Sequence, residues 1–281
     1  MPLWNEQELE IISDSFPDVA DWRVRFKVLG GIPRYVFEVT TDNPTELLES
    51  ACRECELNAI TDMFEAVHSL VHITSTYPFT KSSVSYASET ALNIIVANKG
   101  NEAKRKMVEL LESCQGNPLI ASLCGYIFEP HALQLLEKGG DFTCRQLVHG
   151  EKKLKPDETI LSIPHSSKII VDKVEPNQVR NQLYVPKTTN YTAIDAWIPG
   201  IGAFQMTVGK THDIKGSVKD DLVLLDSDGS KLYWLLPPLY YKSFTKKPPY
   251  DIDQYAVRIP YPSADAYSIS QFSGDQLSDS D

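Results

Sequence analysis

The sequence lacks the features that would place a protein in or across a membrane. It contains no run of 18 apolar residues, so we expect no transmembrane helix. The first ten residues, MPLWNEQELE, have neither a basic region nor an apolar stretch. We therefore expect no signal peptide in the chain as given, and no membrane partner.

Cysteine is scarce as well. The 281 residues include five cysteines, an odd number, which argues for free thiols and a reducing compartment rather than a disulfide framework. An apolar content of 42% and a charged content of 23% are those of a globular protein. The length allows one large domain or two modest ones.

Basic residues are fewer than acidic ones, and the imbalance is uneven. Residues 1–140 carry 11 basic and 20 acidic residues, residues 141–250 carry 15 and 12, and residues 251–281 carry 1 and 6, for a net charge of −11. This balance argues against a general nucleic-acid coat protein. It leaves room for a basic face on the middle segment, although an ordinary mixed-charge surface explains the counts equally well.

Residues 1–75 are predicted to form a helical segment. The stretch from Trp4 to Phe16 has apolar residues at helical spacing, and Gly30-Gly31 marks a turn before a new element at Pro33. Arg34 would stand at the start of that element, either near an anion or simply on the surface. A further helix begins after a capping Asn43.

Within that helix lies the spacing of a two-Cys, two-His zinc finger, Cys52-x2-Cys55-x12-His68-x3-His72. A finger needs a hairpin around its cysteines, whereas this stretch is patterned as helix and has four acids against one base. We therefore reject a zinc finger. Buried helical cysteines are the preferred interpretation, with both histidines on one helix face.

The next part of the chain, residues 76–115, is predicted to connect two domains. Residues 74–90 are rich in Ser and Thr and are expected to form a loop, followed by a strand over 91–97 and a helix over 101–114. A mostly apolar helix is predicted over 118–138, closed by two glycines. It carries one acid in its middle, Glu129, beside Pro130, which should kink or break the helix.

After residue 140 the pattern changes to β. Strands are expected over 142–148, 159–163, 168–171, 182–185, 191–198, 203–208 and 231–236, with a short helix over 218–225. This order predicts an α+β (or α/β) fold, with a mixed sheet flanked by helices in a domain over 116–248. Residues 249–281, rich in Ser, Asp, Tyr and Pro, are expected to be a disordered acidic tail. No internal repeat is evident.

The two strands from 191 to 208 carry the candidate site. They are joined by a Pro199-Gly200 turn, and a single acid, Asp195, lies among apolar neighbours. A buried acid is costly unless it is paired, and its partner here is a metal ion, a lysine, or water at the strand end. Gln205 and Thr207 share one face of the second strand. Two acids, Glu129 and Asp195, with the Gln205 amide oxygen form a ligand set that suits Mg²⁺.

At these residues the chain resembles a known family. An Asp followed after a hairpin by Gln-x-Thr, with a Glu on an earlier helix, resembles the restriction-endonuclease-like pattern. The blocks GGIPRYVF at 30–37, FEPHALQLLEKGGDFTCRQL at 128–147 and YTAIDAWIPG…FQMTVGKTHDIK at 191–215 resemble the C-terminal region of Crinkler-type effectors and their retrotransposon-hot-spot relatives. The resemblance covers about residues 4–240.

The resemblance implies a site and a function. Glu129, Asp195 and Gln205 would be metal ligands, and Mg²⁺ held by them would support phosphodiester cleavage of DNA. Thr207 stands where the nuclease pattern prefers Lys, which puts activity in doubt. Lys210 could replace that lysine only if a bulge at Gly209 turned it onto the same face.

The family also couples such a domain to an ATPase. Gly209-Lys210-Thr211 imitates the end of a phosphate-binding loop, but Phe204 stands where its leading glycine should be, so no ATPase is expected in this chain. Residues 1–75 would be only the lid of that ATPase. The family implies a secreted effector acting in a host nucleus. The alternative is an inactive module of the same family that binds nucleic acid or a host nuclear protein.

Overall fold

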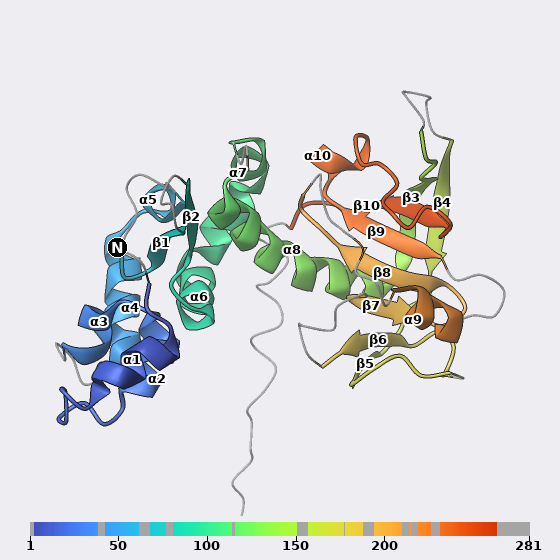
Figure 1. Cartoon of the computed structure of the whole chain (residues 1–281). Helices are drawn as coiled ribbons and strands as arrows, with labels where there is room; N and C mark the ends of the chain where they lie inside the picture. Colours follow the sequence, from blue (N-terminus) through green and yellow to red (C-terminus); the bar gives the residue numbers. More distant parts are fainter. Residues whose placement is uncertain are drawn as a thin grey trace, which may run out of the picture. The chain divides into compact units, whose positions relative to one another are not determined.

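The computed structural model describes residues 3–38, 43–61, 68–76, 81–113, 116–150, 157–176, 178–187, 194–209, 214, 218–225 and 231–262. The chain divides into two compact units, and the division falls between Cys124 and Gly125, inside a long helix. Helices and a large mixed sheet together give an α+β fold, as predicted (Figure 1).

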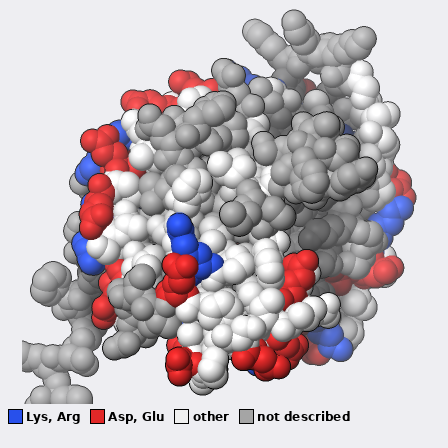
Figure 2. All heavy atoms as spheres, turned by 60° about the vertical axis from the view of Figure 1, so that its left-hand side comes forward, with Lys and Arg blue, Asp and Glu red and all other residues white. Residues whose placement is uncertain are grey.

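The first unit is mostly helical. Its helices are α1 (Glu6–Ser13), α2 (Trp22–Leu29), α3 (Pro33–Phe37), α4 (Pro44–Glu54), α5 (Leu57–Thr61), α6 (Glu89–Arg105) and α7 (Met107–Ser113), and two strands, β1 (Val71–Thr76) and β2 (Lys81–Tyr86), pair antiparallel. In the view that brings this side forward, acidic side chains gather along the lower edge around a broad uncharged area (Figure 2). This agrees with the excess of acids in residues 1–140.

The paired glycines join α2 to α3 as predicted. Gly30 has φ 75° and Gly31 accepts a 2.8 Å hydrogen bond from the Trp4 amide, so the turn docks onto the start of α1. Arg25 on α2, only 1% exposed, donates to the carbonyls of Val36 (2.9 Å) and Tyr35 (3.2 Å). The buried arginine thereby holds the short α3 helix in place, because carbonyls at a helix end otherwise need water.

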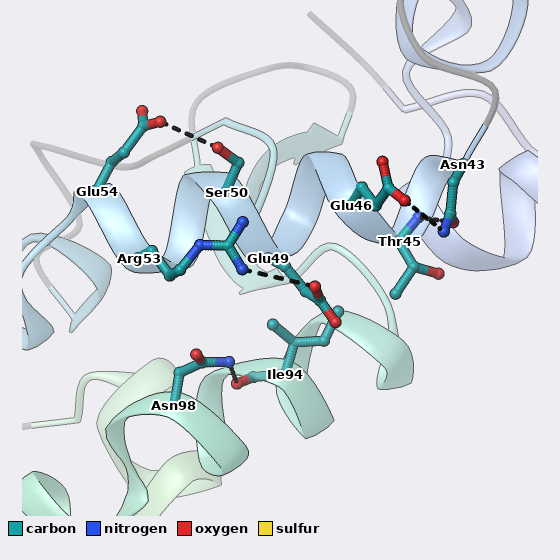
Figure 3. A network of polar contacts seen from close by, with 9 residues as sticks. All are labelled: Asn43, Thr45, Glu46, Glu49, Ser50, Arg53, Glu54, Ile94 and Asn98. Atoms are coloured by element: carbon teal, nitrogen blue, oxygen red, sulfur yellow. Dashed lines mark hydrogen bonds and ion pairs between the residues drawn. The ribbon is translucent and has the colours of Figure 1, made fainter.

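The α4 helix confirms its predicted cap (Figure 3). The Asn43 side chain accepts from the Thr45 amide at 3.0 Å, and Pro44 occupies the first turn. An exposed ion pair joins Arg53 to Glu49 at 3.6 Å on the outer face. Cys52 is fully buried and, like Cys55, is a free thiol whose pKa is raised by burial.

Two expectations between residues 71 and 105 are wrong. The predicted loop over 74–90 includes the end of β1 and all of β2. His72 lies in β1 rather than on a helix face with His68. The predicted strand over 91–97 is part of α6. Ser88 caps that helix by accepting from the Ala91 amide at 3.0 Å, and the buried Ala91, Ile94 and Ile95 follow helical spacing.

The second unit is built on an eight-stranded sheet. The strand order is β4-β3-β10-β9-β8-β7-β6-β5. The strands are β3 (Gly140–Gln146), β4 (Glu158–Ile163), β5 (Lys168–Val171), β6 (Leu183–Pro186), β7 (Ala196–Ile198), β8 (Gly202–Met206), β9 (Leu232–Leu236) and β10 (Gln254–Arg258). The predicted strands are confirmed to within about two residues at their ends, except for the strand expected over 191–198. Its residues 191–193 lie outside the described residues, and Ile194 and Asp195 precede β7.

The strand pairing changes from antiparallel to parallel at the candidate site. β6, β7 and β8 are antiparallel neighbours, and helix α9 (Val218–Leu225) then crosses over so that β9 runs parallel to β8. One sheet face packs against α9 and the segment of α10 (Pro238–Tyr241) (Figure 1). Its buried cluster contains Trp197, Ala203, Val218, Leu222, Leu232, Trp234, Leu236, Tyr241, Phe244 and Ala256.

Helix α8 (Pro118–Lys138) has the predicted bounds. It continues through Pro130 to Lys138, so the proline does not break it, and Gly139 at φ 70° follows its end. By length and hydropathy α8 could cross a membrane, and half of the relevant window is buried in the protein. Figure 1 shows α8 behind the sheet and α9 in front of it.

The expected disordered tail over 249–281 is wrong in its first part. Residues 254–258 form β10, which lies between β3 and β9 in the middle of the sheet. Ala256, Val257 and Ile259 are fully buried. Residues 263–281 lie outside the described residues. The second unit therefore depends on a strand that its acidic, proline-rich surroundings concealed in the sequence.

Candidate functional site

Asp195 lies at the start of β7, where the hairpin ladder becomes irregular. The register pairs Ala196 with Phe204, yet the Asp195 amide donates to the same Phe204 carbonyl at 3.0 Å. Its carboxylate Oδ2 accepts from the Met206 amide at 2.6 Å. The half-buried carboxylate thus replaces a main-chain acceptor at the end of the ladder, and it fixes the separation of the two strands.

Gln205 is brought to the same place by the register. It precedes Met206, whose amide donates to the Asp195 carboxylate, and it is paired with Trp234 on β9. Gln205 is 4% exposed. Because alternate residues of a strand share a face, Gln205 lies on the face of Ala203, the face that packs against α9. The structure therefore brings together Asp195 and Gln205 of the predicted set.

Thr207 follows on the same strand. Its amide continues the ladder to the Leu235 carbonyl at 3.2 Å, and its hydroxyl accepts from the Gly209 amide at 3.1 Å. The side chain is 9% exposed. Thr207 is therefore a neutral, nearly buried group beside Gln205. Lys210, the predicted substitute for a catalytic lysine, lies outside the described residues.

Glu129 occupies a different position. It is exposed on α8, four residues after Gly125, where an added Cβ would lie 3.7 Å from the Val208 side chain. The protein surrounding this carboxyl partly desolvates it and raises its pKa, even though the residue as a whole remains exposed. No described hydrogen bond or ion pair joins Glu129 to Asp195 or Gln205.

The donor set suits a hard cation in its chemistry. Carboxylate and amide oxygens are ligands that Mg²⁺ accepts, and Asp195 and Gln205 supply one of each from facing strands. Among the described residues, no three His, Cys, Asp or Glu side chains group together as a metal site would require. A metal at this place would therefore depend on an amide oxygen and water as well as carboxylates.

The sequence pattern missed two buried polar residues near the site. Gln254 on β10, fully buried, accepts from Trp234 Nε1 at 3.1 Å, and Trp234 is the neighbour of Gln205. Arg145 on β3 is 6% exposed and donates to main-chain carbonyls. A polar residue inside an apolar strand was the signal that singled out Asp195, and it also applied to Arg145. Gln254 fell within the expected tail.

Comparison with known proteins gives a consistent result. The chain is similar to two Crinkler effector proteins. It is 47% identical over 275 residues to Crinkler effector protein 15 of Phytophthora infestans and 46% identical over 275 residues to Crinkler effector protein 16 of the same organism. Each match covers 93% of this chain. The predicted resemblance to Crinkler-type effectors is therefore supported over nearly the whole chain.

The chain spans less than half of each of these Crinkler relatives, 45% and 44% of their lengths. No family model matches the chain. No solved structure matches it either. The similarity therefore supports a Crinkler-type sequence, while the retrotransposon-hot-spot relationship and the ATPase-lid origin of residues 1–75 stay predictions.

Proposed function

We propose that the protein is a secreted effector whose second unit carries a metal-dependent nuclease-like site acting on DNA phosphodiesters, in the nucleus of a host cell. One observation carries the proposal. The Asp195 carboxylate accepts a hydrogen bond from the amide of Met206, the residue between Gln205 and Thr207. The effector role is supported by the similarity to two proteins named Crinkler effector proteins.

Each residue has a stated part in this proposal. Asp195 and Gln205 would hold Mg²⁺, and the bound ion would polarise the phosphoryl group and activate water. Glu129 lies on α8, on the other side of the sheet from Gln205, so the proposed metal site relies on Asp195, Gln205 and water. The Thr207 hydroxyl, oriented by the Gly209 amide, can donate to a phosphate oxygen without supplying the positive charge of a lysine.

The test is nicking of supercoiled plasmid DNA by the purified protein with Mg²⁺ or Mn²⁺. Asp195→Asn keeps an oxygen that can accept from the Met206 amide but removes the charge, so the hairpin should survive. We expect it to lower the nicking rate by about 100-fold, the effect typical of losing one electrostatic group in a catalytic site. Glu129→Gln tests whether the carboxylate on α8 takes part.

The matched control is Asp172→Asn, an exposed acid in the same unit. It should nick at the wild-type rate, and a chelator should abolish nicking by both proteins. Equal nicking by Asp195→Asn and the wild type would contradict the proposed site. A folded wild-type protein that leaves the plasmid intact would contradict the proposed activity.

A second function is favoured by the contacts of the same residues. The Asp195 carboxylate already bridges the hairpin through the Met206 amide, and Thr207 is neutral where the nuclease pattern prefers a lysine. Both features fit an inactive member that retains the fold and binds nucleic acid or a host nuclear protein. Retained DNA binding without cleavage would support this second function.

A further inference from the structure

The second unit contains a basic stretch in an otherwise acidic protein. No acidic residue lies between Asp228 and Asp251, whereas this interval contains four lysines, Lys231, Lys242, Lys246 and Lys247. Three of them fall within residues 241–250, here called the basic loop. The whole chain has a net charge of −11, so the basic loop runs against the overall charge.

Two buried side chains of the sheet hold the main chain of the basic loop. Arg145 donates through Nη2 to the carbonyls of Tyr241 (2.7 Å) and Phe244 (2.6 Å). Gln254 donates through Nε2 to the carbonyls of Lys247 (2.6 Å) and Pro249 (3.1 Å). Its Oε1 accepts from the Lys247 amide at 3.0 Å. These hydrogen bonds fix the loop against the sheet over most of its length.

This anchoring determines what the loop presents to solvent. Tyr241 and Phe244 are buried and point into the core under the loop. Lys242 is exposed, and Lys246 and Lys247 are half-buried. The Lys247 ammonium lies 4.9 Å from the centre of the Phe244 ring, which orders its stem. The ammonium groups are therefore held on a rigid backbone, so a ligand would meet them with little loss of loop entropy.

The acids nearby only partly neutralise the basic loop. Asp251 pairs with Lys219 of α9 at 2.6 Å, and its pKa is lowered by that hydrogen bond, with a smaller contribution from Lys246. Glu158 lies across β3–β4 from Arg145. Asp251 is thus shared between two lysines, and Asp253 is a further exposed acid two residues on, so Lys219, Lys242, Lys246 and Lys247 stand against three nearby acids in all.

An exposed aromatic ring lies at the end of the basic loop. Tyr250 is 44% exposed, and its ring centre lies 3.7 Å from that of His149, the residue that follows Val148 after β3. An ordered ring that remains open to solvent can stack on a nucleobase, and such stacking tolerates any base. Lysines beside an exposed aromatic ring fit a nucleic-acid strand better than an acidic peptide.

We propose that the basic loop is a nucleic-acid binding surface, where Lys242, Lys246 and Lys247 contact phosphates and Tyr250 stacks on an unpaired base. The loop lies on the sheet face that carries Gln205, because Gln205, Trp234 and Gln254 are linked across β8, β9 and β10. The choice of ligand rests on the proposed function. The surface itself is separate from the Asp195 site and needs no metal.

The test is binding of a fluorescein-labelled single-stranded DNA 20-mer, measured by anisotropy in EDTA over a series of salt concentrations. Lys242→Gln/Lys246→Gln/Lys247→Gln removes three charges but keeps part of each stem. We expect its affinity to fall at least about tenfold, and the slope of log K against log salt to become shallower by about 2, as expected for three lost phosphate contacts. Tyr250→Ala should weaken binding about tenfold, with Tyr250→Phe close to wild type.

The matched control is Lys168→Gln/Lys173→Gln/Lys187→Gln, which removes three exposed charges elsewhere in the second unit. It should leave the salt slope unchanged within about 0.5 if the basic loop makes the contacts. Equal weakening by the two triple variants would overturn the proposal, since binding would then follow net charge alone. Absence of binding by the folded wild type would overturn it too. Preference for a duplex over the single strand would overturn the stacking role of Tyr250.

The binding test separates this inference from the nuclease proposal. Asp172→Asn, which lies outside both the Asp195 site and the basic loop, should bind the 20-mer as the wild type does. Binding of the 20-mer without cleavage would contradict the nuclease proposal and support the binding surface. Cleavage by the lysine triple variant at wild-type rate and affinity would contradict the binding surface and support the nuclease proposal.

Discussion

Both units bury an arginine whose task is to hold main-chain carbonyls, but they use it differently. In the first unit, Arg25 ties down the end of the five-residue helix α3. In the second, Arg145 ties down the segment that follows α10, and Gln254 adds further hydrogen bonds to it. The first arrangement closes a helix against its own unit. The second builds an exposed, charged loop.

The comparison shows how irregular backbone is accommodated against a core. Buried carbonyls need donors, and where no strand or helix supplies them a buried side chain must. In the second unit, Arg145 and Gln254 supply these donors. The first unit also buries His72, which is 2% exposed and whose Nε2 meets no hydrogen-bond partner among the described residues. The units should therefore differ in their response to mutation and to pH.

Removing the arginine should give the largest effect in the second unit. Arg145→Met would leave the Tyr241 and Phe244 carbonyls buried without a donor, at a cost of about 3 kcal/mol in the free energy of unfolding. Hydrogen exchange should show lost protection across residues 241–249. Arg25→Met should cost less, about 2 kcal/mol, because the carbonyls that it holds belong to the five-residue helix α3 rather than to a long irregular segment. The increase in exchange should be confined to α3. Equal exchange in both regions for both variants would contradict the comparison.

The next largest effect should come from lowering the pH, which should destabilise the first unit. Burial, with a smaller contribution from His68, lowers the pKa of His72 to about 4. Its ordinary pKa is about 6.5, so the unfolded chain binds the proton more tightly. Stability is therefore full above pH ~6.5 and falls as the pH drops towards 4, by about 3 kcal/mol at most. Amide exchange in β1, followed from pH 7 to 4.5 and corrected for intrinsic rates, measures the loss.

His72→Gln supplies the control, because it removes the titrating ring and should flatten this pH dependence. Acid sensitivity of β1 that persists in His72→Gln would show that another group is responsible.

The second unit should respond to pH in the opposite direction through Glu129. The raised pKa of Glu129 means that the folded state favours its protonated carboxyl, so its contribution to stability is present at low pH and is lost as the pH rises.

The sequence predicted the second unit better than the first, for a physical reason. Helices 118–138 and 218–225 and most strands of the large sheet were placed correctly, since their apolar runs are long and bounded by Gly and Pro. Residues 91–97 failed because Ile94-Ile95-Val96 is β-branched, a strand preference that the Ser88 cap and the buried helical stripe overrode. The β1–β2 hairpin was hidden by its Ser and Thr content.

The candidate site was predictable only as far as one hairpin. Asp195 comes close to the strand that carries Gln205 because a short hairpin fixes the register locally. The position of Glu129 depends on how α8 packs against the sheet, which no local pattern contains. The basic loop lies about 100 residues after Arg145 but only a few residues before Gln254. Both side chains can bind it only because β10 pairs with β3 in the sheet, and no local sequence pattern shows that pairing.

The smallest effect on stability should come from removing a contact between neighbouring residues of one helix. Asn43 caps α4 by accepting from the Thr45 amide, in a first unit where helices follow their own sequence signals. Asn43→Ala should lower the unfolding free energy by about 1 kcal/mol, whereas Asn43→Asp should retain the cap and gain from the helix dipole. Thermal unfolding gives the size, and amide exchange should rise only in the first turn of α4. Increased exchange in β9 or β10 with Asn43→Ala would show that the two units are coupled, and the contrast between local and long-range anchoring would then be lost.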